Sequence, residues 1–135
     1  MKKTGILNQP ISAVLAGLGH TDTLVVADAG LPIPQSTLRI DLALKPNVPA
    51  FIETLEVILG EMQVEGAVIA EEMLEQSPET YKAVIELLGD IPIQTVSHVE
   101  FKNQLPHARA VIRTGEFTAY ANVILIAGVW GFQGK

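Results

Sequence analysis

The stretch His20-Thr-Asp-Thr-Leu-Val-Val-Ala-Asp28-Ala-Gly-Leu-Pro-Ile-Pro34 contains a continuous apolar run, 23–27, followed by an aspartate and a loop rich in glycine and proline. An unbroken β-branched run of this length is typical of a strand covered on both faces, as in a parallel sheet. Such sheets bind ligands beyond the carboxyl ends of their strands, which makes Asp28 a candidate binding residue. His20 is the nearest group that can move a proton near neutral pH.

Helix and strand signals alternate along the rest of the chain. Apolar spacing and turn residues predict helices over 10–18, 50–62 and 78–88, a short helix from Ser97-x-x-Glu100, and strands over 39–44, 67–70, 91–96, 110–114 and 123–127. Gly19 is expected to cap the first helix. This order predicts one α/β domain over residues 1–135, a layered and mostly parallel sheet with helices on both faces. The fold is expected to be Rossmann-like without the dinucleotide fingerprint.

Several chemistries are excluded by what the motifs lack. Gly17-Leu18-Gly19 follows a predicted helix instead of a strand, and Asp22 stands where a third glycine of the dinucleotide site would be. The sequence has no phosphate loop, no Gly-x-Ser-x-Gly and no cysteine, and its three histidines lack metal-ligand spacing. We therefore expect no cofactor and no metal, which leaves proton transfer or binding.

The amino-acid composition limits the classes of binding partner that we expect. Only 18% of the 135 residues are charged while 48% are hydrophobic, and charged residues average about 25% in globular proteins. Part of the apolar surface is therefore expected to lie between subunits of a homo-oligomer. The net charge of −6 and the lack of a basic run argue against nucleic acid. The longest apolar run, 123–130, is too short to cross a bilayer, so we expect no membrane partner and a cytoplasmic protein.

Polar side chains follow the ends of several predicted strands and should meet at one rim of the sheet, namely Asp28, Glu71, Ser97, His98 and the segment 114–116. Both the start of a helix and Lys102, one turn later, should lower the pKa of His98. Glu71 and Glu72 would point to opposite faces of a strand, so we interpret them as structural. Tyr120 and Asn122, on either side of Ala121, suit a polyhydroxylated ligand.

Each candidate also has a purely structural explanation. His20 could bond the last carbonyls of the preceding helix, and Asp28 could form a turn before Ala29-Gly30. His98 could be a solvated residue at a helix start, and Tyr120 could simply open a strand. His107, which follows a proline, is expected in a surface loop.

Several segments together resemble the family of ribose pyranases and fucose mutarotases over nearly the whole chain. These segments are Gly19-His20-Thr21-Asp22, Ala27-Asp28-Ala29-Gly30-Leu31-Pro32-Ile33-Pro34, Arg39-Ile40-Asp41, His98-x-x-Phe101-Lys102, Ile112-Arg113-Thr114-Gly115-Glu116 and Tyr120-Ala121-Asn122. The segment 27–34 is more similar to the ribose enzymes than to the fucose mutarotases. The last six or so residues lie beyond the resemblance.

The resemblance implies a cytoplasmic, cofactor-free homo-oligomer, a homodecamer of stacked pentameric rings that interconverts the pyranose and furanose forms of D-ribose. His20 would be the proton donor, and the sugar contacts would be Asp28, His98, Tyr120, Ala121 and Asn122. Lys102 is expected to orient or polarise the anomeric end together with His98. Opening an aldopyranose needs a base at the anomeric hydroxyl and an acid at the ring oxygen, and histidine suits the acid. The alternatives are a mutarotase of another sugar such as fucose, or a non-catalytic sugar-binding or regulatory protein.

Overall fold

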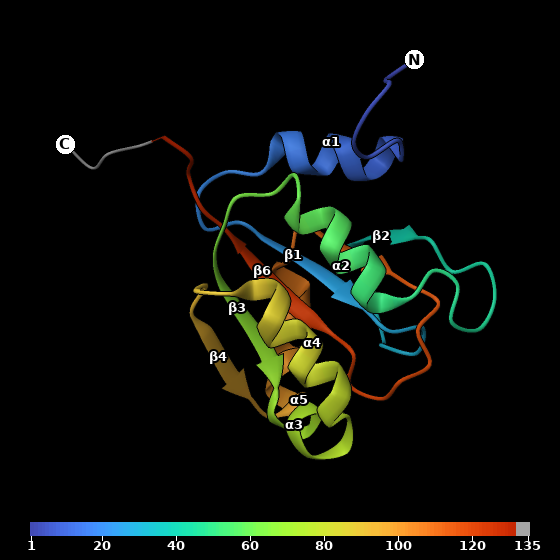
Figure 1. Ribbon diagram of the computed structural model, residues 1–135, viewed down its shortest axis with the longest axis vertical. Helices are drawn as coiled ribbons and strands as arrows, with labels where there is room; N and C mark the ends of the chain where they lie inside the picture. The colour runs from blue at the N-terminus through green and yellow to red at the C-terminus, as the bar shows by residue number, and fades with distance from the viewer. Residues whose placement is uncertain (132–135) are drawn as a thin grey trace.

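The computed structural model describes residues 1–131, which form a six-stranded sheet with helices packed on it (Figure 1). The strands are β1 Thr23–Ala27, β2 Leu38–Asp41, β3 Val64–Ala70, β4 Ile93–Val96, β5 Ala110–Arg113 and β6 Val123–Ala127. The helices are α1 Gln9–Gly17, α2 Phe51–Leu59, α3 Glu71–Gln76, α4 Pro78–Leu88 and α5 His98–Gln104, with the 3-10 turn η1 Leu105–His107. The α/β fold expected from the sequence is confirmed.

The order of the strands is β2-β5-β1-β6-β3-β4, and β6 is the strand that breaks the parallel pattern. The β1–β5, β2–β5 and β3–β4 pairs are parallel, whereas β6 runs antiparallel to both of its neighbours. The carboxyl ends of the other five strands therefore meet at one edge, where β6 begins. As a result, the residues just before β6 lie at the same edge of the sheet as the residues that follow β1, β4 and β5.

The central strand β1 shows why the sequence has a continuous apolar run there. Leu24 and Val26 pack into one hydrophobic cluster, and Val25 and Ala27 pack into a second cluster on the other face of the sheet. All four side chains are fully buried. In Figure 1, α2 and α4 lie in front of the sheet and α5 lies behind it. Because both faces are covered, β1 has no solvent-facing position from Leu24 to Ala27.

Two helices begin at a side-chain cap, and the second of these caps confirms a prediction from the sequence. Asn8 caps α1, since its side chain accepts a hydrogen bond from the backbone N–H of Ile11 at 2.9 Å. Ser97 caps α5 in the same way, accepting from the backbone N–H of Glu100 at 3.1 Å. Short polar side chains at these positions satisfy N–H groups that the first helical turn leaves free.

Two other local predictions are wrong. α1 ends at Gly17 and its C-cap is Leu18 in extended conformation, so Gly19 is not the cap. Glu71 and Glu72 do not lie on a strand but form the first turn of α3, which the sequence analysis missed. Their carboxylates are favourable there because the amino end of a helix carries partial positive charge.

Within the described residues, no helix combines the length and the apolar character that a bilayer crossing requires.

Candidate functional site

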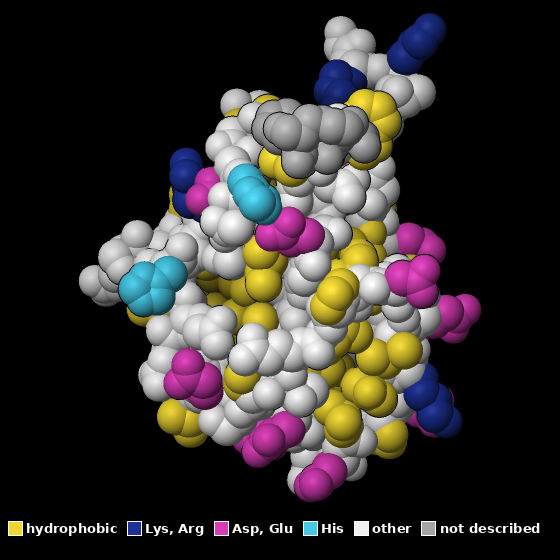
Figure 2. Space-filling view, turned by 90° about the vertical axis from the view of Figure 1, so that its left-hand side faces the viewer, with side chains coloured by type: hydrophobic (Ala, Val, Ile, Leu, Met, Phe, Trp, Pro, Cys, Tyr) yellow, Lys and Arg dark blue, Asp and Glu magenta, His cyan; other side chains and the backbone are white. Residues whose placement is uncertain are grey.

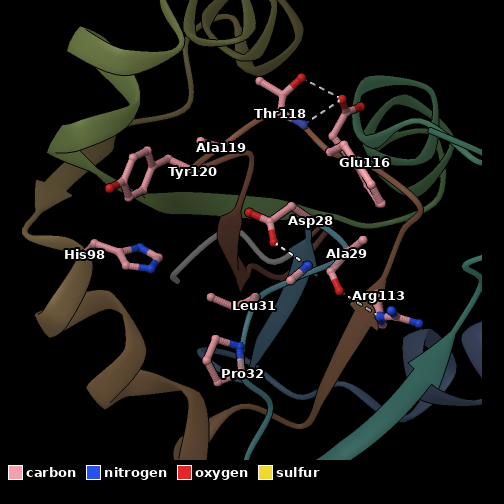
Figure 3. Close-up of a pocket in the computed structure, with 12 residues that line it drawn as sticks. Asp28, Ala29, Leu31, Pro32, His98, Arg113, Glu116, Thr118, Ala119 and Tyr120 are labelled. Atoms are coloured by element: carbon pink, nitrogen blue, oxygen red, sulfur yellow. Dashed lines mark hydrogen bonds between the residues drawn. The ribbon is translucent and has the colours of Figure 1, made fainter. Parts of the chain in front are cut away.

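A pocket of about 500 Å³ opens at the carboxyl edge of the sheet. Its walls are the loop 28–32 after β1, His98 at the start of α5, Arg113 at the end of β5, and the segment 116–120 before β6. Figure 3 shows Asp28 in the middle of the pocket, His98 and Tyr120 on one side, and Arg113 and Glu116 on the other. The sequence prediction of a polar rim at this edge is confirmed for Asp28, His98 and Glu116.

Asp28 is held by a closed set of hydrogen bonds. Its Oδ1 accepts from the backbone N–H of Gly30 at 2.9 Å, and its Oδ2 accepts from Nδ2 of Asn122 at 3.0 Å. Burial raises the pKa of Asp28, and these hydrogen bonds oppose the rise only in part. The result is a fixed carboxyl group that accepts hydrogen bonds and has more affinity for a proton than an aspartate in water.

The side chain of Asn122 is fully buried and faces Asp28. Its Nδ2 donates to the Asp28 carboxylate, and its Oδ1 accepts from the Asp28 backbone N–H at 2.8 Å. This reciprocal pair fixes which way round the amide lies. Ala121 is fully buried as well. The structure therefore places Asn122 as the support of Asp28, one layer below the pocket.

His98 presents a neutral imidazole to the pocket. Burial is the main reason why its pKa is lowered, the positive charge of Lys102 lowers it further, and Glu72 and Asp28 act in the opposite direction. Its Nδ1 is buried without a hydrogen-bond partner among the described residues. A proton on Nδ1 would be unsatisfied, which favours the tautomer with the proton on Nε2. The expected effect of Lys102 is confirmed, and burial adds to it.

Tyr120 packs against His98 in an unusual backbone conformation. The two rings meet edge to face, with centroids 5.0 Å apart and an interplanar angle of 84°. The φ angle of Tyr120 is +61°, a left-handed value that costs energy for a side chain of this size. The loop before it is anchored by Ser77, whose hydroxyl donates to the carbonyl of Ala119 at 2.6 Å. The strained backbone conformation of Tyr120 thus accompanies the placement of its phenol at the pocket.

Two residues that the sequence analysis did not single out as site residues stabilise the walls of the pocket. Glu72 accepts a hydrogen bond from the backbone N–H of His98 at 2.9 Å, which ties α3 to the start of α5. Arg113 donates from Nε to the carbonyl of Ala29 at 2.9 Å and pairs with Asp41 at 3.1 Å. Adjacent acidic residues directly after a strand were the available signal for Glu72, but their interpretation as strand residues hid it.

Glu116 lines the pocket, but both of its carboxylate oxygens already accept hydrogen bonds from the protein. Its Oε1 accepts from the backbone N–H of Phe51, and its Oε2 accepts from the hydroxyl of Thr118 at 2.7 Å. Burial alone would raise the pKa of Glu116, but these hydrogen bonds together with the Thr118 backbone N–H lower it. This carboxylate shapes the loop before β6 and stays ionised.

Lys102 is not among the residues that line the pocket, and it acts on the pocket through its charge on His98.

His20 lies at the opposite end of β1 from the pocket. It precedes Thr23 while Asp28 follows Ala27, and five strand residues span about 17 Å. Its Nε2 pairs with both carboxylate oxygens of Glu65, at 2.9 and 3.0 Å. The chain therefore does not bring His20 to its own pocket, although the two are close in sequence.

The pocket as built suits a small, neutral, polyhydroxylated ligand. Asp28 offers acceptors, the Nε2–H of His98 a donor, Tyr120 a phenol, and Leu31 and Pro32 an apolar wall. Among residues 1–131, no group of three or more His, Asp or Glu side chains could hold a metal ion.

Comparison with known proteins agrees with this geometry. The model of the RbsD / FucU transport protein family matches residues 1–130. D-ribose pyranases of Laribacter hongkongensis and Coprothermobacter proteolyticus are 57% and 54% identical over 129 residues, covering 96% of this chain and 98% of each relative. The structure of Bacillus subtilis RbsD complexed with D-ribose superimposes with a TM-score of 0.94 at 52% identity, covering 96% of this chain and 99% of that one.

A more distant similarity is found to the fucose mutarotase of Streptococcus pneumoniae in complex with L-fucose, with a TM-score of 0.75 and 25% identity over 92% of this chain and 94% of that one. The ribose proteins are thus much more similar to this chain than the fucose protein is. Because the family model matches nearly the whole sequence, the chain belongs to the RbsD / FucU transport protein family.

Proposed function

We propose that this protein is a D-ribose pyranase, an intramolecular isomerase that interconverts the pyranose and furanose forms of D-ribose. The observation that carries the proposal is the pocket in which Asp28, His98 and Tyr120 converge with acceptor, donor and phenol groups. The relatives with more than half of their residues identical are D-ribose pyranases, and a structure with nearly the same fold holds D-ribose. This likeness favours ribose over fucose as the sugar.

Within the pocket, each residue has a distinct part in binding. Asp28 accepts hydrogen bonds from sugar hydroxyls, and Asn122 holds it in place. The Nε2–H of His98 donates to a sugar oxygen, and Lys102 helps to keep that ring neutral. Tyr120 adds its phenol, and Ala121 contributes through its backbone.

The proton donor in this proposal is His20 of a second copy of the chain. His20 lies beyond the reach of the pocket of its own chain, at the other end of β1. A neighbouring copy can place its own His20 over the pocket if the amino edge of one sheet meets the carboxyl edge of another. The active site is then shared between subunits, and a single chain is incomplete.

The surface supports such an assembly. Large apolar side chains stand exposed at both edges of the sheet: Leu44 and Phe117 near the pocket, and Leu38 at the amino end of β2. Hydrophobic side chains also gather on the face that carries β4 (Figure 2). Contiguous apolar surface of this kind is typical of an interface between subunits. We propose a homo-oligomer, and the resemblance to the ribose pyranases suggests stacked pentameric rings in the cytoplasm.

The reaction needs only proton transfers. The anomeric hydroxyl gives its proton to a basic group in the pocket, the bond between C1 and the ring oxygen breaks, and that oxygen takes the proton that His20 delivers. The open aldehyde then closes through a different hydroxyl, and the proton transfers run in reverse. Nothing is oxidised or reduced, and a positioned acid contributes about 10²- to 10⁴-fold to such a rate.

Mixing two inactive variants tests the shared site. One variant is His20→Gln, with an intact pocket; the other combines Asp28→Asn with His98→Phe and keeps His20. Each should fail to accelerate pyranose–furanose exchange of D-ribose in NMR exchange spectra. Unfolded together and refolded as mixed oligomers, they should recover about a quarter of the wild-type rate, because half of the chains supply a pocket and half of their neighbours supply a histidine.

The same experiment separates the alternatives. Mixed oligomers that stay inactive would place donor and pocket in one chain. A wild-type protein that binds D-ribose without accelerating exchange would be a sugar-binding protein instead of an enzyme. Faster exchange with L-fucose than with D-ribose would make it a fucose mutarotase.

A further inference from the structure

Glu65, the partner of His20, occupies an irregular position in the sheet. Val64 of β3 pairs with Ala127 of β6, but the next paired residues are Gly66 and Ile126. Glu65 is therefore an extra residue in β3, a β-bulge that interrupts the ladder. It is also the exposed position in a strand whose other residues are all buried. Bulges turn a side chain away from the direction that a regular strand would give it, and they are frequent beside active sites.

The surroundings hold Glu65 in place. A Cβ built on Gly128 would lie 3.1 Å from the Cβ of Glu65, so the glycine leaves the space that the bulge needs. The backbone N–H of Gly128 donates to the carbonyl of Gln63 at 2.9 Å, which closes the ladder beyond the bulge. Glu65 is thus packed against its neighbour strand at Cβ while its carboxylate extends outward.

The turn that carries His20 is equally constrained. The backbone N–H of Thr21 donates to the carbonyl of Ala127 at 2.9 Å, and that of Asp22 donates to Gly19 at 3.1 Å. Thr21 has a φ angle of +72°, which is unfavourable for a β-branched residue. Strain of this kind persists where the surrounding structure imposes it, and it is concentrated at functional sites.

Other charges beside this turn are already neutralised. Asp22 accepts from the backbone N–H of Gly19 at 2.8 Å and pairs with Arg109 at 3.1 Å. Among the described residues, the carboxylate that contacts the His20 ring is Glu65, on Nε2. No hydrogen bond to Nδ1 of His20 is found within residues 1–131.

From this geometry we propose that Glu65 is a positioning residue for catalysis: it binds Nε2 of His20 and leaves Nδ1 to deliver the proton to sugar in the pocket of the neighbouring copy. The proposal rests on the proposed function, in which His20 is the donor. A carboxylate on one ring nitrogen fixes both the orientation of the ring and the tautomer that forms when the proton has left. After transfer the ring keeps its Nε2–H toward Glu65, and Nδ1 is the free lone pair that takes the proton back.

The test compares three full-length variants with the wild type. Glu65→Ala removes the acceptor, Glu65→Gln keeps an oxygen at the same reach, and Glu79→Ala removes a carboxylate from another exposed ion pair, the one with Lys82. Exchange of D-ribose is measured by NMR at several sugar concentrations. Long-range ¹H–¹⁵N spectra at alkaline pH report which nitrogen of each neutral histidine carries the proton, and the His20→Gln variant assigns the His20 signals.

We expect Glu65→Ala to lower the maximal exchange rate about tenfold, a fraction of what a positioned acid contributes. Half-saturation by ribose should stay unchanged, because Glu65 contacts His20 and is not one of the residues that line the pocket. His20 should lose its preference for Nε2–H, Glu65→Gln should restore most of the rate and the preference, and Glu79→Ala should match wild type.

Two results would overturn the assignment of Glu65. In the first, Glu65→Ala exchanges ribose as fast as Glu79→Ala does. In the second, Glu65→Ala is slow but His20 keeps the wild-type tautomer, which would show that the loss of rate is structural. Failure of the proposed function looks different. If His20→Gln exchanges ribose as fast as wild type, His20 is not the donor, whatever the Glu65 variants show.

Discussion

The pocket at the carboxyl edge of the sheet and the His20–Glu65 pair at the amino edge differ in how far their side chains are buried. In the pocket, burial shifts the pKa values of Asp28 and His98, and one ring nitrogen of His98 has no partner among the described residues. The His20–Glu65 pair is open to water, with 53% and 43% of the two side chains exposed. The proposed binding groups are thus held in a partly buried pocket of one chain, while the proposed donor lies on its surface.

This difference shows that the His20–Glu65 pair does little for the stability of one chain. An exposed ion pair contributes about 0 to 1 kcal/mol, and solvent screening reduces it further. The bulge at Glu65 leaves one residue of β3 outside the regular pairing, and the positive φ angle of Thr21 costs energy in an exposed turn. The Asp28–Asn122 pair, in contrast, satisfies buried groups that would be costly to leave unpaired. These energy costs agree with the proposal that the amino edge acts between copies of the chain.

The largest effect that would sharpen this comparison is expected from His20→Gln. The variant should lower the maximal rate of pyranose–furanose exchange by about 10²- to 10⁴-fold, because a positioned acid is removed. Its D-ribose affinity should stay within about twofold of wild type, since the pocket is intact. NMR exchange spectra and calorimetry measure the two quantities. His107→Gln, at an exposed histidine of η1, is the control, and an equal loss in both variants would contradict the assignment.

Asp28→Asn should come next, with an effect on binding. Both carboxylate oxygens accept hydrogen bonds from N–H groups, so the new amide must point its NH₂ at a donor, either Gly30 or Asn122. Turning the Asn122 amide around would break its bond to the Asp28 backbone N–H. The mismatch should weaken D-ribose binding by about 1 to 3 kcal/mol. Calorimetry with Asp90→Asn as an exposed control checks this, and unchanged affinity would show that Asp28 lies outside the sugar site.

His98 should make stability depend on pH in a defined window. Its pKa in the folded protein is below its ordinary value of 6.5, so between these two values the unfolded chain binds a proton that the folded chain does not. Stability should therefore be complete above pH 6.5 and fall as the pH drops toward the lowered value. His98→Phe should lack this slope. Denaturant midpoints at fixed protein concentration from pH 7.5 to 5 test it, and a slope that persists in the variant would assign it to another group.

Tyr120→Phe should have the smallest effect of the series. The variant keeps the edge-to-face contact with His98 and loses only the phenol hydroxyl. Ribose affinity should fall by about 0.5 to 1.5 kcal/mol, the usual net value of one hydrogen bond. Titration by NMR measures the change, and Tyr81→Phe on α4 is the matched control. Equal affinities in both variants would mean that the phenol does not touch the sugar.

Local sequence signals were sufficient for most of the fold. The run 23–27 predicted a strand buried on both faces, and β1 is fully buried from Leu24 onward. Ser97 and Glu100 predicted the start of α5. One error lies where two local signals compete: Glu71 and Glu72 follow a strand in sequence, but helix-favouring acidic residues end β3 at Ala70. The bulge at Glu65 has no sequence signature of this kind, since it depends on what β6 places opposite.

The sequence by itself determined the α/β class, the strand β1 and the pocket residues at its carboxyl end, because hydrophobic periodicity and caps act over a few residues. Tertiary structure decided which of these residues can meet. The antiparallel strand β6 brings Tyr120 and Asn122 to Asp28, across more than ninety positions of sequence. The direction of β1 separates His20 from Asp28, which are only eight positions apart, because an extended strand holds its two ends at maximal distance.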